Sequence, residues 1–97
     1  MKVYQILKTR KFIKIFNKLD NTIRTELNSL IEKLKTNPYI GKPLHSTWFR
    51  ELKVKKYRVY YIIYEDKVEI LMIGISDKKG QQKEIELIKK TFIQRKI

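Results

Sequence analysis

The sequence predicts an α+β fold in which a helical hairpin packs on a twisted antiparallel sheet and a further helix follows at the C-terminus. Residues 50–75 either alternate between apolar and polar side chains or are rich in Val, Ile and Tyr, which is typical of consecutive strands. Residues 9–36 carry two apolar stripes at helical spacing, and residues 82–97 carry a third. Because 97 residues without a linker or repeat support one modest core, we expect a single domain of residues 1–97.

The N-terminal part is predicted to form a short strand, at residues 3–7, and two helices. Thr9 is a suitable N-cap for the first helix, and Asp20 can end that helix and cap the second. The second helix is expected to stop at residues 36–37, because the residue before Pro38 avoids the helical region. So short a link between the helices predicts an antiparallel hairpin. The apolar positions of the two stripes are Phe12, Ile15, Phe16 and Leu19, then Ile23, Leu27, Leu30, Ile31 and Leu34.

Residues 37–47 contain two prolines and a glycine, which predicts a loop before the sheet. Within the sheet, a two-residue turn at residues 55–56 would place Val54 opposite Tyr57 and Lys53 opposite Arg58. This register sorts the side chains onto two faces. One face would hold Leu52, Val54, Tyr57, Val59, Tyr61 and Ile63, and the other Glu51, Lys53, Arg58 and Tyr60.

The second of these faces places two cations directly opposite each other. Such a pair lowers stability unless an anion lies between the charges. A solvated basic face would explain the pattern, and so would a platform that binds phosphate. The alternation alone does not decide between these interpretations.

Residues 68–75 are apolar at nearly every position, so both faces of this strand are expected to be covered. The helical hairpin can cover one face. The C-terminal segment is the candidate for the other, with Ile85, Ile88, Phe92 and Ile93 on one helical side.

The chain carries 23 Lys and Arg against 10 Asp and Glu, a net charge of +13. Such an excess favours polyanionic partners, first nucleic acid and second an acidic protein. The absence of cysteine excludes disulfides and Cys-based zinc sites, and His45 cannot form a metal centre alone, so we expect no cofactor. Because the N-terminus has no signal-peptide pattern and no apolar run approaches the ~18 residues of a membrane span, we expect a cytoplasmic protein without membrane contact.

The order strand, two helices, three-stranded meander and terminal helix resembles the RelE/ParE/HigB superfamily of bacterial and archaeal toxins. Residues 37–44, NPYIGKPL, resemble the family's loop after the helical hairpin. Residues 49–61, FRELKVKKYRVYY, resemble its central hairpin, and residues 78–86, KKGQQKEIE, resemble the ending of the HigB-like branch. The resemblance covers nearly the whole chain and implies a RelE-like (microbial RNase-like) fold.

The same resemblance implies a toxin of a type II toxin–antitoxin pair. In the RelE and HigB branches such a protein cleaves mRNA in the ribosomal A site and so inhibits translation, whereas in the ParE branch the target is DNA gyrase. The implied partners are an acidic antitoxin, RelB-like or HigA-like, and the ribosome with its mRNA. A toxin–antitoxin heterotetramer is one assembly that this partnership allows.

The resemblance also implies residues for a metal-independent cleavage in which the 2′-hydroxyl attacks the adjacent phosphate. Arg58 matches the family's Tyr-Arg arginine and would stabilise charge on the phosphate, although it could instead pair with Glu51. Lys53 matches a basic position on the preceding strand, where crowding by cations favours the neutral form that could act as the base. Lys78 would protonate the leaving oxygen or hold the phosphate. The cations expected to bind the RNA are Arg50, Lys55, Lys56, Lys79 and Lys83.

One feature departs from the family. RelE-like ribonucleases usually place a Tyr, and HigB-like ones a His, near the start of the last helix, and residues 76–86 contain neither. Tyr60 or Lys78 could substitute as a catalytic group. A gyrase inhibitor without nuclease activity and a non-catalytic RNA- or ribosome-binding module are therefore the alternatives to an mRNA endonuclease.

Overall fold

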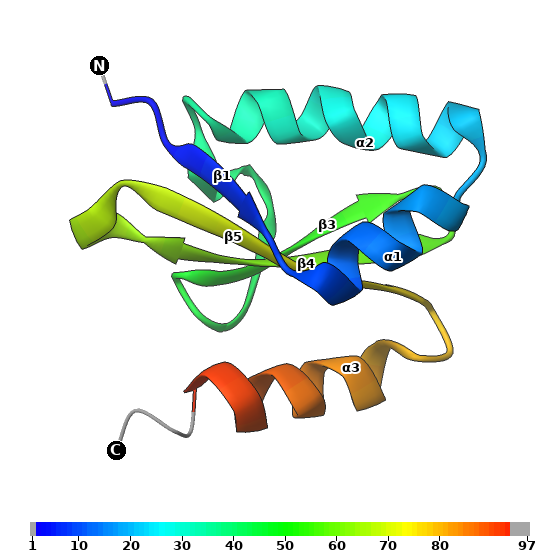
Figure 1. Cartoon of the computed structure of the whole chain (residues 1–97). Helices are drawn as coiled ribbons and strands as arrows, with labels where there is room; N and C mark the ends of the chain where they lie inside the picture. The colour runs from blue at the N-terminus through cyan, green and yellow to red at the C-terminus, as the bar shows by residue number, and fades with distance from the viewer. Residues whose placement is uncertain (1, 94–97) are drawn as a thin grey trace.

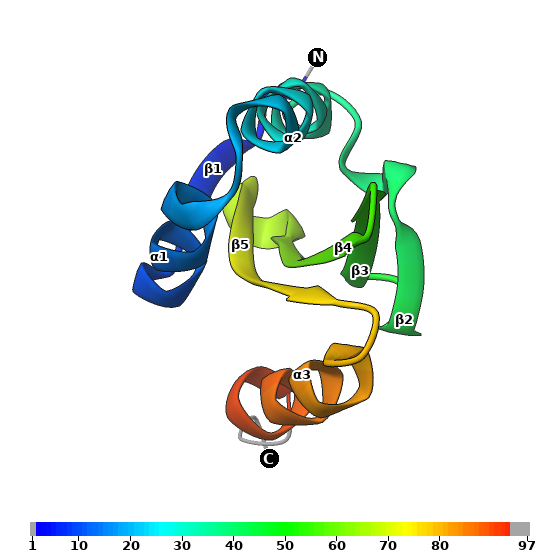
Figure 2. The ribbon, with the colours of Figure 1, turned by 90° about the vertical axis from the view of Figure 1, so that its right-hand side faces the viewer.

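The computed structural model describes residues 2–93 and contains a five-stranded sheet with helices on both sides (Figures 1 and 2). The strands are β1 (Gln5–Lys8), β2 (Lys42–Ser46), β3 (Phe49–Val54), β4 (Tyr57–Tyr64) and β5 (Glu69–Asp77). The helices are α1 (Arg10–Lys18), α2 (Asn21–Leu34) and α3 (Gln81–Ile88), with 3-10 turns at Pro38–Ile40 and Glu65–Lys67 and a π-helical turn at Lys89–Ile93. The predicted α+β fold with a C-terminal helix is confirmed.

Side-chain caps begin both helices of the hairpin, as predicted. Oγ1 of Thr9 accepts a hydrogen bond from the Phe12 amide at 3.0 Å, and Oδ1 of Asp20 accepts one from the Ile23 amide at 3.0 Å. Each cap satisfies an amide that has no partner within its own helix. The short link at residues 19–20 then returns the chain as α2 over the same side of the sheet (Figure 2).

The hairpin of β3 and β4 has the predicted register. Lys53 pairs with Arg58 and Val54 with Tyr57, and residues 55–56 form the turn between them. The first turn residue adopts a left-handed φ of 55°, which a lysine tolerates less readily than asparagine or glycine. Register therefore follows from the match of apolar positions on one face rather than from a favourable turn sequence.

The sheet is mixed, which corrects the expectation of a purely antiparallel sheet. β1 runs parallel to β5 and forms one edge of the strand order β1-β5-β4-β3-β2. The direction follows from α1, which starts immediately after β1 and packs against β5. Thr9 fixes this junction, because its amide donates to the carbonyl of Met72 at 3.0 Å and its hydroxyl to that of Ile73 at 2.7 Å. β1 must therefore point toward the same end of the sheet as β5.

Part of the predicted loop is also a strand. β2 pairs antiparallel with β3 at the other edge of the sheet, with an irregularity between Pro43 and Ser46. A proline is tolerated there because an edge strand does not need every amide for pairing. The prolines and glycine that indicated a loop thus mark a bulged edge strand and the turn before it.

Two apolar clusters lie on opposite faces of the sheet. The first joins α1 and α2 to the face that holds Val54, Val59 and Tyr61. The second joins Phe49, Tyr60, Ile62 and Ile73 to Ile88 of α3, with Ile85, Phe92 and Ile93 packed at its border. The C-terminal segment therefore covers the second face as predicted, up to residue 93, and residues 94–97 lie outside the described part.

No helix within residues 2–93 combines the length and the apolar character that crossing a bilayer requires.

Candidate functional site

An open cleft of about 630 Å³ lies at the edge of the sheet where β2 no longer covers β3. Its walls come from α2, the start of β2, β3 and β4. Four cations line it, Lys33, Lys42, Lys53 and Arg58, together with one carboxylate, that of Glu51. Pairing of β3 with β2 and β4 sets the spacing of these groups, because Lys42 pairs with Glu51 and Lys53 with Arg58. The cleft therefore concentrates positive charge around a single acid.

Arg58 is held inside this cleft and is not a free surface cation. Its Nε lies 3.9 Å from Oε2 of Glu51, and the two side chains are only 13% and 7% exposed. Nη1 makes a long contact of 3.5 Å with the carbonyl of Tyr57, and within residues 2–93 Nη2 has no hydrogen-bond acceptor. The pairing with Glu51 that the sequence left open is thus present, and it leaves one edge of the guanidinium for another anion.

Glu51 also connects the cleft to the last helix. Its Oε1 accepts a hydrogen bond of 2.7 Å from Nε2 of Gln81, the first residue of α3. A buried carboxylate is stable only with such partners, so Arg58 and Gln81 together hold the charge of Glu51. Sequence reasoning missed Gln81, Lys33 and Lys42. The sequence signal for such partners was Glu51 itself, because it is the single acid on a strand face that otherwise carries cations and so needs polar partners.

Lys53 is exposed in the cleft opposite Arg58, and the loop after β5 lies at the same end of the sheet. β4 pairs with β5 so that Arg58 lies opposite Ser76 and Tyr57 opposite Asp77. The next residue along the chain is Lys78. The fold therefore brings the exposed Lys78, Lys79 and Lys83 to the end of the sheet that carries the β3–β4 turn.

Tyr60 lies on the sheet face that also carries Lys53 and Arg58. Its side chain is beneath α3 and fully buried. Its hydroxyl shares a hydrogen bond of 2.7 Å with Oγ of Ser76. Burial raises the pKa of Tyr60 above its ordinary value, and the hydrogen bond to Ser76 opposes that shift. Proton transfer from Tyr60 to a substrate would therefore require α3 to move.

Arg50 serves the structure of the neighbouring loop. Its guanidinium donates to the carbonyls of Gly41 at 2.9 Å, Thr47 at 2.8 Å and Tyr39 at 3.1 Å. It also stacks 5.2 Å from the centre of the Tyr39 ring. These contacts use one donor on each of its three nitrogens and leave two of the five N–H donors of Arg50 for another acceptor.

The two turn lysines remain at the surface. Nζ of Lys55 lies 3.8 Å from Oε1 of Glu26, an exposed pair of small energetic value. Nζ of Lys56 lies 5.5 Å from the centre of the Tyr57 ring. Both can still reach a polyanion bound at this end of the sheet.

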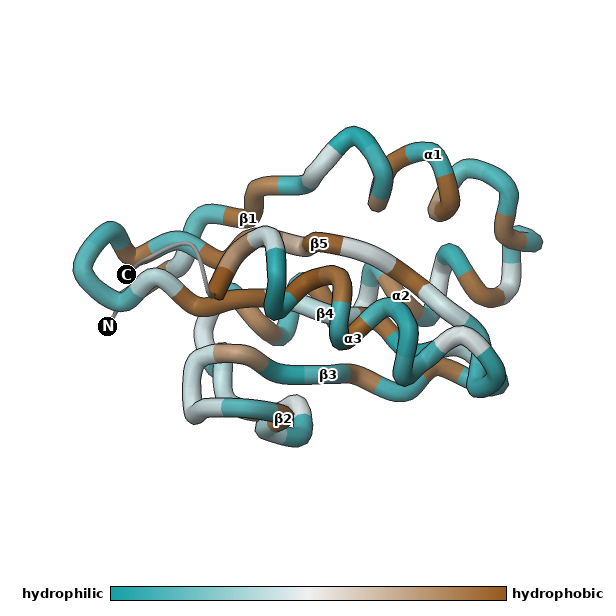
Figure 3. Tube along the Cα trace, turned by 90° about the horizontal axis from the view of Figure 1, so that it is seen from below, coloured by the Kyte–Doolittle hydropathy of each residue, from teal (hydrophilic) through white to brown (hydrophobic). Residues whose placement is uncertain are grey.

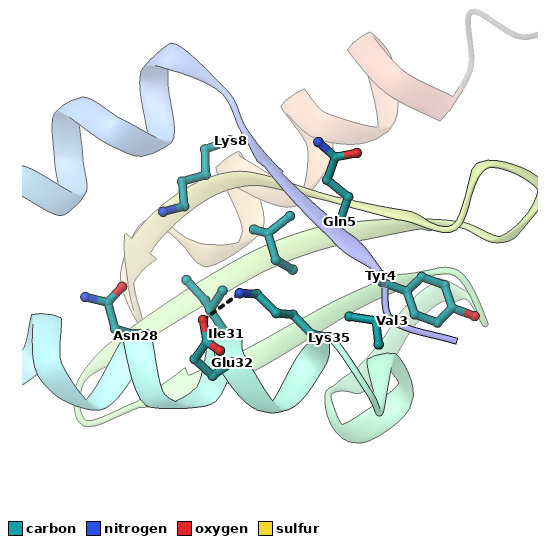
Figure 4. Close-up of a pocket in the computed structure, with 9 residues that line it drawn as sticks. Val3, Tyr4, Gln5, Lys8, Asn28, Ile31, Glu32 and Lys35 are labelled. Atoms are coloured by element: carbon teal, nitrogen blue, oxygen red, sulfur yellow. Dashed lines mark ion pairs between the residues drawn. The ribbon is translucent and has the colours of Figure 1, made fainter. Parts of the chain in front are cut away.

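A second hollow, of about 610 Å³, lies between β1 and α2 (Figure 4). Its polar lining includes Lys8, Asn28 and an ion pair of 2.7 Å between Glu32 and Lys35. None of the predicted site residues lines it. Within residues 2–93, no group of three or more His, Asp or Glu side chains is placed to hold a metal ion. We therefore assign the candidate site to the cationic cleft.

Comparisons with known proteins agree with this architecture. The family model described as ParE toxin of type II toxin-antitoxin system, parDE, matches residues 5–79. A double arginine-to-alanine mutant of E. coli toxin RelE in the free state matches with a TM-score of 0.78 and 20% identity, over 93% of this chain and 99% of that one. No curated protein sequence matches significantly.

Two toxin–antitoxin complexes are also similar in structure. The toxin in the intact E. coli RelBE complex matches with a TM-score of 0.70 and 22% identity, over 76% of this chain and 95% of that one. The archaeal RelE–RelB complex from Pyrococcus horikoshii matches with a TM-score of 0.72 and 14% identity, over 78% of this chain and 96% of that one. At these identities the structures establish a shared fold.

Proposed function

Since the chain belongs to the family of ParE toxins of type II toxin–antitoxin systems, within the RelE/ParE superfamily, we propose that it acts as a ribosome-dependent mRNA endonuclease that inhibits translation. The observation that carries the proposal is the cross-strand pair of Lys53 and Arg58 in a cleft with Lys33 and Lys42. Cations held at such spacing by a rigid sheet suit the charge that builds on a phosphate during transfer.

The proposed reaction uses the 2′-hydroxyl of the RNA as nucleophile. Lys53 acts as the base that accepts the proton of that hydroxyl, and the 2′-oxygen forms a bond to the adjacent phosphorus. The bond from phosphorus to the 5′-oxygen breaks, and Lys78 donates a proton to that oxygen. The products are a 2′,3′-cyclic phosphate and a 5′-hydroxyl. Arg58 contributes through the edge of its guanidinium that Glu51 leaves unoccupied.

A type II toxin is controlled by an antitoxin, and the charge of +13 supports an acidic one. RelB is the antitoxin in the two structurally similar complexes described above. We infer a comparable partner for this chain, either RelB-like or HigA-like, with a heterotetramer as one arrangement. The ribosome and mRNA complete the proposed set of partners.

A second candidate function is inhibition of DNA gyrase without nuclease activity. The ParE family match favours it, and so does the lack of Tyr or His in residues 76–86. In that case the ion pair between Arg58 and Glu51 would be structural, and the cationic cleft would bind the antitoxin. Substitution of Lys53 would then leave toxicity unchanged.

The deciding experiment is primer extension on mRNA from a translating extract, with purified protein added in the presence or absence of ribosomes. The proposal expects cuts that need ribosomes and that weaken about 10²- to 10³-fold in Arg58→Ala, the typical cost of one transition-state donor. Lys53→Gln, a change at an exposed position, should weaken them with unchanged thermal stability. Lys67→Gln, which lies outside the cleft, is the matched control.

Intact mRNA in cells arrested by the protein would contradict the nuclease proposal. Loss of supercoiling activity in a gyrase assay would then identify the second function. Retained cleavage in both cleft variants would show that the catalytic groups lie elsewhere.

A further inference from the structure

The exposed side of α1 carries four cations on one narrow arc. With 3.6 residues per turn, Arg10, Lys11, Lys14 and Lys18 fall within about 100° of each other around the helix axis. We call this set the basic face of α1. The helix contains no acidic residue at any position. It is therefore basic along its whole exposed length.

Most of this charge has no anionic partner within the protein. Lys11 forms an ion pair of 2.9 Å with Glu84 of α3. Within residues 2–93, the exposed Arg10, Lys14 and Lys18 form no ion pair. Like charges four residues apart destabilise a helix, so this spacing acts against folding unless an external anion offsets it. A shallow hollow of about 420 Å³ runs along the same residues.

The basic face is separate from the cationic cleft. α1 packs against β5, whereas the cleft lies at the β2–β3 side of the strand order. Figures 2 and 3 place α1 and β2 on opposite sides of the molecule. A ligand that contacts both surfaces at once must span the sheet. An extended or folded polyanion is long enough to contact both surfaces. A short oligonucleotide bound in the cleft does not reach the basic face of α1.

The composition of the basic face favours a phosphate backbone over an acidic protein segment. Protein interfaces combine charge with apolar anchors at their centre. No apolar side chain lies within the arc of the four cations. The exposed Ile13 lies about 60° beyond Arg10 at one border, and Ile15, which packs toward the core and also borders the hollow, lies about 40° beyond Lys11 at the other. Phosphate contacts need cations and little else.

We propose that the basic face of α1 is a second anchoring surface, which binds the phosphate backbone of a folded RNA while the cleft acts on its own RNA segment. The inference rests on the proposed function in that RNA is the target. It concerns binding, so it is measured independently of cleavage.

The test compares two variants that each lose three positive charges, at different positions. The first is Arg10→Gln, Lys14→Gln and Lys18→Gln together, and the control is Lys35→Gln, Lys67→Gln and Lys90→Gln, positions scattered over other elements. Affinity is measured across a series of salt concentrations for bulk transfer RNA as the folded probe and for a short single-stranded RNA oligonucleotide.

The α1 variant should bind transfer RNA roughly 10- to 100-fold more weakly, with a salt slope reduced by about 2 to 3, one unit per lost phosphate contact. Its affinity for the short oligonucleotide and its thermal stability should match those of the control. Equal losses in both variants would overturn the proposal in favour of a general effect of net charge. Unchanged transfer RNA affinity with weakened binding of an acidic antitoxin would assign the surface to protein instead. Absence of mRNA cleavage by the unaltered protein would count against the nuclease proposal alone, because the binding comparison does not depend on it.

Discussion

Glu51 on β3 holds Arg58 on β4 through an ion pair of 3.9 Å that is almost closed to solvent. The pair offsets the charge of Arg58, the residue that lies opposite Lys53 across the strands, and so reduces the repulsion between the two cations. Gln81 ties the same carboxylate to α3. The candidate site is therefore coupled to the position of the C-terminal helix.

The first prediction concerns the energy of this pair. Glu51→Gln and Arg58→Gln should each destabilise the protein, because each leaves a shielded charge without its partner. The double variant should cost less than the sum of the two, with a coupling energy of about 1 to 2 kcal/mol. Urea unfolding of the four proteins measures it.

A matched control is the exposed pair of Lys55 and Glu26, whose atoms are 3.8 Å apart. Its coupling energy should be below about 0.5 kcal/mol, because solvent screens the charges. Equal coupling in the two cycles would mean that shielding at Glu51 and Arg58 has no energetic effect.

The second prediction concerns the buried hydroxyl of Tyr61, which fixes the turn before β2. It donates to the carbonyl of Pro38 at 2.7 Å and accepts from the amide of Gly41 at 3.1 Å. Tyr61→Phe leaves both backbone groups without a partner and should cost about 1 to 3 kcal/mol of unfolding free energy. Tyr57→Phe, a half-buried position, should change it by less than about 0.5 kcal/mol. Similar values for the two variants would rule out this role.

The third prediction tests the close approach of α3 to β5. A Cβ on Gly74 would lie 2.6 Å from Oε2 of Glu84, the carboxylate that pairs with Lys11. Gly74→Ala should therefore cost about 1 kcal/mol in the native background, as an overpacked contact does. In a Glu84→Ala background the same change should be neutral or slightly stabilising, because alanine restricts the unfolded chain. The same cost in both backgrounds would show that Glu84 is not the obstacle.

The fourth prediction concerns pH. Glu65 accepts hydrogen bonds from Tyr39 and Tyr4, and these bonds lower its pKa below the ordinary value of 4.5. A carboxylate with a depressed folded-state pKa contributes stability above pH 4.5 that is lost as the pH falls through the folded value. Glu65→Gln should therefore lose less stability than the native protein on acidification, as measured by urea midpoints across pH.

At alkaline pH the same cluster loses stability as the pH rises, the opposite direction to the loss in acid. The hydrogen bond to Glu65 is the main cause that raises the pKa of Tyr39 from 10.0 to about 12. This contribution is present below pH 10 and is lost between pH 10 and about 12, as the phenol ionises. Tyr39→Phe should abolish that part of the alkaline loss. Parallel pH profiles in all three proteins would contradict the role of this cluster.

Local patterns in the sequence were sufficient for the helices, their caps and the β3–β4 register. Thr9 and Asp20 cap the amides of residues only three positions away, and Val54 pairs with Tyr57 across a two-residue turn. Such contacts depend on neighbours in the chain, so apolar spacing and capping chemistry predict them. The placement of Lys53 opposite Arg58 followed from the same register.

Only the tertiary structure decided which distant groups meet. β1 joins β5 in parallel because α1 packs on β5, and residues 42–46 become a strand because β3 has a free edge. Gln81 reaches Glu51 across 30 positions in the chain. The sequence gives the charge of each residue, but the partner of a charged residue depends on its position in the folded sheet. That is why the register predicted the cross-strand neighbour of Arg58, while its confinement by Glu51 required the fold.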